Sequence, residues 1–198
     1  MGDSSREVVL RALRASAPRP VALPDLPATG IRFPDVLARF MLALTEVGGA
    51  AVRIPAAADL ETELQRLPAY REARTVASCV PGVLKANVDL SRVQDPHDLS
   101  GVDFAVIPAE LGVAESGAVW VLEEKIHPRA VAFLAQHLAV VLSASALVHN
   151  LHEAYDRIAM PRQGFGMWLS GPSKTADIEQ ALVIGAHGPR SCTVILIG

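Results

Sequence analysis

Cysteine is scarce in this sequence of 198 residues, which has two, Cys79 and Cys192, and no CxxC motif. That count excludes a self-sufficient zinc or iron–sulfur site made from cysteines. We expect both thiols to be small core residues rather than nucleophiles. With no apolar export signal at the start of the chain, two cysteines predict a reduced, cytoplasmic protein.

Aromatic residues and basic runs are also rare. Aromatics make up 5% of the chain, the formal net charge is -3, and Lys and Arg are scattered, so we expect no nucleic-acid face. The longest weakly polar stretch, residues 138–148, is shorter than the ~20 residues of a membrane span, and none is predicted. What is present, 51% hydrophobic residues and a mean hydropathy of +0.30, indicates a globular chain with a full core.

The first thirty residues differ from the rest. Residues 6–15 have apolar side chains at helical spacing behind a capping serine, and the proline-rich stretch 16–30 predicts an extended arm. We therefore divide the chain into a helix and arm, residues 1–30, and a single α/β domain, residues 31–198. The arm makes a homo-oligomer one of the candidate assemblies.

Strand and helix patterns alternate along residues 31–198, and several strands are apolar on both faces. This predicts an α/β fold with a mixed, mostly parallel sheet flanked by helices, and a local antiparallel pair around residues 109–121. Strands are expected at 50–54, 74–80, 102–110, 117–124, 137–143, 165–171 and 191–198. Helices are expected at 34–49, 59–67, 127–136, 144–160 and 175–183.

The segment SGPSKTADIE contains glycine, lysine and threonine where an apolar run ends. It is not a P-loop, because Pro172 and Ser173 stand between Gly171 and Lys174, and proline removes a backbone donor. Two interpretations remain. The segment is an N-cap for a helix from Thr175, or it binds a carboxylate or phosphate, with Asp177 as a further candidate residue. The anion-binding candidates are Ser170, Gly171, Ser173, Lys174 and Thr175.

A second segment, GAHGPRS, follows soon after. Its candidates are His187 as acid, base or anion donor, together with Gly188 and Arg190; the alternative is a polar turn before the last strand. If the two segments belong to a βαβ unit whose helix runs fully antiparallel, they lie at opposite sheet edges. Proximity of His187 to Lys174 is therefore not assumed.

Three other polar residues were considered for chemistry. Glu115 lies beside Ser116-Gly117 in an expected turn. If its carboxylate is buried, it is a candidate acid–base catalyst or nucleophile; the alternative is a solvated acid in a turn. His149 and His152 are three residues apart in an expected helix, a spacing that suits a metal, but no third ligand is evident. A surface helix face is favoured for them, and no metal site is predicted.

Taken together, SGPSKTADIE, GAHGPRS and an apolar last strand resemble the signature of the lactate-utilisation protein C family, the LUD domain, over most of the chain. AESGAVWV is similar to the family's Glu-Thr-Gly motif, with Ser116 and Ala118 departing from it where threonine is usual. The resemblance implies a NagB/RpiA/CoA-transferase-like fold, RpiA being ribose-5-phosphate isomerase.

The resemblance also implies a role in oxidising L-lactate to pyruvate, with iron–sulfur clusters on partner subunits. This chain would be the cluster-free component and bind no cofactor of its own. The alternative is a domain or enzyme for an anionic small molecule, with Glu115 as the catalytic residue. A third interpretation is a stand-alone interaction protein.

Overall fold

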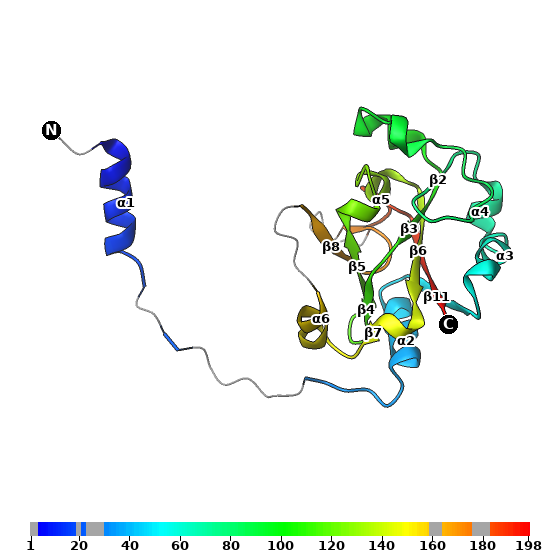
Figure 1. Cartoon of the computed structure of the whole chain (residues 1–198), viewed down its shortest axis with the longest axis horizontal. Coiled ribbons are helices and arrows are strands. Elements are labelled where there is room, and N and C mark those ends of the chain that lie inside the picture. Colours follow the sequence, from blue (N-terminus) through cyan, green and yellow to red (C-terminus); the bar gives the residue numbers. More distant parts are fainter. Residues whose placement is uncertain (1–3, 19–20, 23–29, 159–163, 176–182) are drawn as a thin grey trace.

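The structure is a computed structural model that describes residues 4–18, 21–22, 30–158, 164–175 and 183–198. Its centre is a five-stranded parallel sheet in the order β1-β11-β6-β3-β2 (Figure 1). The strands are β1 (Ala50–Ile54), β2 (Val76–Ser78), β3 (Phe104–Pro108), β6 (His137–Ser143) and β11 (Ser191–Ile197). The predicted α/β class with a mostly parallel sheet is confirmed.

Alternating burial explains why β6 and β11 form the middle of the sheet. Along β6, Leu138, Val140 and Leu142 pack into a core cluster on one face of the sheet. Ala139 and Val141 between them belong to a second cluster, which covers the other face. A strand that is apolar at consecutive positions is stable only when both faces are covered. The two strands pair in parallel from His137 opposite Ser191 to Ser143 opposite Ile197.

A second, smaller sheet covers one face of the first. It has the order β7-β4-β5-β8 and includes the antiparallel β4–β5 pair, which confirms the local antiparallel piece expected there. Its strands are β4 (Leu111–Val113), β5 (Ala118–Leu122), β7 (Leu147–Val148) and β8 (Gly166–Leu169). A third, two-stranded antiparallel sheet is formed by β9 (Lys174–Thr175) and β10 (Val183–Ile184).

Helices complete the layers. In Figure 1, α3 (Leu60–Leu64) and α4 (Pro68–Glu72) lie on the side of the central sheet opposite the smaller sheet, and their apolar side chains fill the second core cluster. On the other side, α2 (Val36–Glu46) packs Phe40 and Leu44 into the first cluster. The remaining domain helices and 3₁₀ segments are α5 (Val131–Leu134), α6 (Leu151–Arg157), η1 (Ala57–Asp59), η2 (Leu90–Arg92), η3 (Pro96–Gly101), η4 (Glu123–Lys125) and η5 (Ala144–Ala146).

Helix α1 (Ser5–Ala15) lies apart from these layers, and none of its residues is buried (Figure 1). Its start confirms the expected cap, because the Ser4 hydroxyl accepts from Glu7 N and the Glu7 carboxylate accepts from Ser4 N. Among the described residues, no helix combines the length and the apolar composition that crossing a membrane requires.

The helix expected over residues 144–160 is wrong in its first part. Residues 144–146 form a 3₁₀ turn, Leu147–Val148 form β7 beside β4, and α6 starts only after its N-cap, Asn150. Leu147 and Val148 fit a helical pattern and a short strand equally well in sequence. Their pairing with Gly112 and Val113 makes them a strand. Residues 159–160 lie outside the described residues.

Candidate functional site

The Ser170–Thr175 segment packs against the C-terminal end of α2. The Lys174 ammonium donates to the carbonyl oxygens of Val47, at 2.7 Å, and Ser170, at 3.2 Å. Val47 is the residue at which α2 ends, so a cation meets the negative end of the helix. Gly171 has φ +71°, and a Cβ there would lie 2.8 Å from Val47 O, so glycine permits this close approach.

The SGPSKT and GAHGPR segments lie side by side. Ser173 N donates to Pro189 O at 2.9 Å, and Gly185 N donates to Ser173 O at 2.9 Å. A Cβ on Gly188 would lie 2.9 Å from Ser173 Cβ. The βαβ arrangement that would place them at opposite sheet edges is therefore not the one found, because β9 in the first segment and β10 just before the second pair antiparallel.

The helix expected over 175–183 is wrong at both of its described ends. Thr175 and Val183 are paired with each other in antiparallel strands, so no helix begins at Thr175. The N-cap interpretation depends on residues 176–182 and stays a prediction. Residues 176–182, including the candidate Asp177, lie outside the described residues. His187 is exposed on the loop before β11.

The Glu115 turn contacts the same region. Ser170 Oγ donates to Ser116 O at 3.0 Å, which joins the turn to the SGPSKT segment. Gly117 has φ +65°, and a Cβ there would lie 2.6 Å from the backbone nitrogen of Leu44 in α2. The three segments that carry the family resemblance are thus joined near the C-terminal end of α2, which the Glu115 turn and SGPSKT contact directly and GAHGPR reaches through Ser173. The Ser116 hydroxyl is buried there and has no hydrogen-bond partner among the described residues.

Glu115 itself is half-buried and caps α6. Its Oε1 accepts from Leu151 N at 3.1 Å, and its own N donates to His149 O at 3.1 Å. A carboxylate at the first turn of a helix satisfies a free backbone donor there. The interpretation of Glu115 as a fully solvated turn acid is therefore incomplete. Its role as a catalytic acid, base or nucleophile stays a prediction.

The two histidines considered for a metal do not share a helix face. His149 precedes α6 and accepts from Phe33 N through Nδ1 at 3.0 Å, whereas His152 lies within the helix. Surface placement on one helix face is wrong for His149, because residues 149 and 150 are not helical. In the part of the chain that the structure describes, no three His, Cys, Asp or Glu residues are grouped so that they could hold a metal.

Both cysteines pack in the core. Cys192 is buried in β11, and burial raises the pKa of its thiol to about 12. Cys79 is half-buried against the same cluster, and burial raises the pKa of its thiol to about 11. Thiols with such pKa values stay protonated at neutral pH and are poor nucleophiles.

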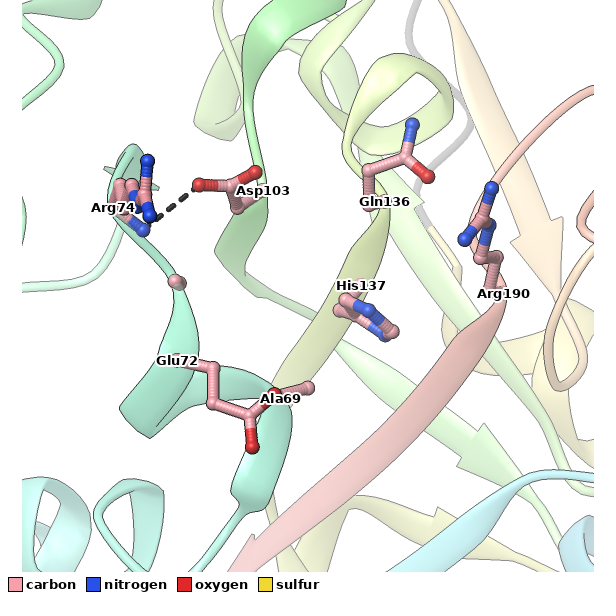
Figure 2. A pocket seen from close by; sticks show the side chains of 8 residues that line it. Ala69, Glu72, Arg74, Asp103, Gln136, His137 and Arg190 are labelled. Carbon is pink, nitrogen blue, oxygen red and sulfur yellow. Dashed lines mark hydrogen bonds between the residues drawn. The ribbon is translucent and has the colours of Figure 1, made fainter.

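A polar pocket that the sequence analysis missed lies at the amino-terminal edge of the central sheet (Figure 2). Its volume is about 390 Å³, and it collects residues at the starts of four adjacent parallel strands together with residues of α4. The polar residues that line it are Glu72, Arg74, Asp103, Gln136, His137 and Arg190. Each strand start carries one or two polar residues before an apolar run. That pattern becomes a signal only once the strand order is known.

The base of this pocket is the His137 imidazole. Its Nδ1 lies 2.8 Å from the Ser191 hydroxyl on the neighbouring strand. Burial, followed by the positive charge of Arg190, lowers the pKa of His137. Asp103 has a different role, because its Oδ2 accepts from the backbone nitrogens of Arg74 and Thr75, and these bonds lower its pKa.

Comparison with known proteins connects the chain to one family. Residues 81–197 match the model of the LUD domain. A "Lactate utilization protein C" of Deinococcus radiodurans is 27% identical over 197 residues, which are 95% of this chain and 91% of that protein. Proteins of the same name from Bacillus subtilis and Shouchella clausii are 33% and 31% identical, over 49% and 48% of this chain. Those two alignments span 41% and 44% of the relatives' own length.

A solved structure shares the fold. The crystal structure of a DUF162 family protein from Deinococcus radiodurans superimposes with a TM-score of 0.65 at 18% identity. The match covers 82% of this chain and 96% of that one. At this identity the likeness concerns the architecture alone.

Proposed function

The chain belongs to the LUD domain family, and on that premise we propose that it is the cluster-free component of an iron–sulfur system that oxidises L-lactate to pyruvate. A role in lactate utilisation at the level of the family is supported by relatives named for it in several bacteria. The match of residues 81–197 to the family model is the observation that carries the proposal.

The chemistry of the cysteines supports the cluster-free part. An iron–sulfur cluster is held by about four thiolates, and this chain has two cysteines. Both are packed in the core, with thiol pKa values raised to about 11 and about 12. Electron transfer from lactate would then depend on clusters carried by other subunits, which are the proposed partners.

The convergence of the three family segments at the end of α2 is the proposed functional surface of the domain. It combines Glu115, Lys174 and the loop that carries His187. As an anion site it has one remaining N–H donor of Lys174, because the other two donate to the carbonyl oxygens of Val47 and Ser170. As a contact surface for a partner subunit it needs no free ammonium, and we favour the second use.

Two measurements test the proposal. The full-length chain, purified without oxygen, is expected to contain no stoichiometric iron or sulfide, and a cluster in the purified chain would refute the cluster-free part. In the organism that encodes it, deletion of the gene is expected to abolish growth on L-lactate and spare growth on pyruvate. Normal growth of the deletion strain on L-lactate would refute the lactate role.

A further inference from the structure

We propose that the pocket at the amino-terminal edge of the central sheet binds a small hydroxylated anion, whose carboxylate or phosphate group is held by Arg190, Gln136 and His137. This inference does not depend on the proposed function, because the pocket lies at strand starts, although Arg190 belongs to the GAHGPR segment that also joins the surface at the end of α2. Ligands of open α/β sheets usually bind at the carboxyl ends of strands, so the pocket is identified from its residues and not from the fold.

Parallel pairing fixes the pocket's framework. Because adjacent strands are spaced about 4.8 Å apart, residues at the same end of β11, β6, β3 and β2 form a row. Arg190 precedes β11, His137 begins β6, Asp103 precedes β3 and Arg74 lies two residues before β2. Arg190 N donates to Gln136 O at 2.8 Å, which fixes these two pocket residues beside each other.

The stem of the Arg190 side chain packs against Gly185. A Cβ on Gly185, which has φ +74°, would lie 2.5 Å from Arg190 Cγ, so the absence of a side chain at Gly185 makes room for this stem. The GAHGPR segment therefore positions an arginine. Neither the Arg190 nor the Arg74 guanidinium has a hydrogen bond or salt bridge within the described part of the chain. Unpaired guanidinium groups beside a cavity match carboxylate and phosphate oxygens.

The pocket is chemically divided, as Figure 2 shows. Arg190, Gln136 and His137 lie toward one side, and Glu72, Arg74 and Asp103 toward the other. The first side has donors and no carboxylate, so the anionic group of a ligand fits there. On the second side, the exposed Glu72 carboxylate offers an acceptor for hydroxyl groups. A ligand with an anion at one end and hydroxyls at the other matches both sides.

The pKa of His137, measured with and without ligand, distinguishes anion binding at this pocket from a purely structural role of its residues. Four groups face the His137 ring. Ser191 begins β11 and Arg190 precedes it, Asp103 precedes β3, and Glu72 lies in α4. An anion bound at Arg190 offsets the positive charge that lowers the His137 pKa. Bound anion should therefore raise the His137 pKa, and by linkage the anion should bind more tightly as the pH falls from 8 to 5.5.

The test uses the full-length protein at constant ionic strength with three probes: inorganic phosphate, glycerol 3-phosphate and L-lactate. Calorimetry gives the affinity, and the NMR titration of the His137 ring, assigned with His137→Gln, gives its pKa with and without each probe. We expect saturable binding of at least one probe and a raised His137 pKa in its presence. Preference for glycerol 3-phosphate assigns a phosphate ligand, and preference for L-lactate assigns a carboxylate.

Matched variants locate the site. Arg190→Gln is expected to weaken binding about tenfold or more, whereas Arg92→Gln, which removes an equal charge from an exposed position outside the pocket, should leave it unchanged. Gln136→Leu is a second variant that removes a donor and keeps the side-chain volume. The proposal is overturned if none of the probes binds saturably, or if Arg190→Gln and Gln136→Leu bind as Arg92→Gln does. Loss of lactate growth on gene deletion has no bearing on this result, so the two proposals can fail separately.

Discussion

The Lys174 ammonium lies 2.7 Å from the carbonyl oxygen of Val47, where α2 ends. This contact links the most characteristic loop of the chain to the end of a core helix. The same loop holds Ser116 through Ser170 and Pro189 through Ser173. These hydrogen bonds join the family segments to one another and to α2, and we call them the structural lock. They account for the presence of Lys174 and Ser170 without any ligand.

Replacing Lys174 tests how much the lock contributes. Lys174→Met keeps the length of the side chain and removes both hydrogen bonds to carbonyl oxygens, so we expect a loss of about 1 kcal/mol in the free energy of unfolding. Lys125→Met breaks the surface pair of Lys125 with Glu110 and should cost less. Denaturant unfolding compares the two. Unchanged stability in Lys174→Met would contradict a stabilising role for these two hydrogen bonds.

Gly117 is predicted to be irreplaceable for packing as well as for conformation. Gly117→Ala places a Cβ 2.6 Å from Leu44 N at φ +65°, so α2 must shift, and we expect a loss of about 3 kcal/mol or more. Gly82→Ala is the matched control, because φ is +84° there and no atom lies within 4 Å. It should cost only about 1 kcal/mol, from backbone strain. Equal losses would contradict the packing argument.

Glu115 can be separated into a capping role and a catalytic role. Glu115→Ala removes the acceptor for Leu151 N and should cost about 1 kcal/mol of stability, whereas Glu115→Gln keeps an oxygen acceptor and should cost less. Thermal unfolding of both variants measures this. If the carboxylate also acts in catalysis, Glu115→Gln will abolish lactate-dependent growth while the protein remains folded. Normal growth with this variant would contradict the catalytic prediction.

His137 should make the domain sensitive to mild acid. Its pKa in the folded state is lowered, mainly by burial and then by Arg190, while Asp103 and Glu72 oppose the shift. The unfolded chain therefore binds more protons as the pH falls, so this part of the stability is present above pH ~6.5 and is lost as the pH falls through the lowered pKa. Between pH 8 and 5.5, the wild type should lose more stability than His137→Gln. Parallel curves would refute this assignment.

Helix α1 is predicted to add nothing to the stability of residues 31–198. Val9 and Leu13 are 57% and 61% exposed, so the double variant Val9→Glu, Leu13→Glu removes no domain contact. We expect its unfolding midpoint to equal that of the wild type. A lower midpoint would mean that α1 packs on the domain and that the division at residue 30 is wrong.

The central sheet was predictable because burial on both faces leaves a mark in the sequence. Residues 137–143 and 191–198 are continuous apolar runs of strand length, and they are found as β6 and β11. Residues 50–54, also apolar, form β1 at the edge of the same sheet. Such runs need no knowledge of their partners, since few other structures accommodate them.

Short elements were less predictable because their partners decide them. Leu147 and Val148 fit a helical pattern but pair with β4, and Thr175 fits a helix start but pairs with Val183. The amino-terminal pocket was missed for a related reason. Arg190 was a candidate from its own segment, but His137 and Asp103 lie far from it in sequence, and only the order of the parallel strands brings the three together.

The most direct test of the proposed function is lactate-dependent electron transfer in extracts. Oxygen-free extracts of a strain that lacks the gene are mixed with L-lactate and a redox dye, with and without the purified full-length chain. The account predicts little dye reduction without the chain, and recovery in proportion to the amount added back. Dye reduction at the wild-type rate in the extract without the chain would contradict it.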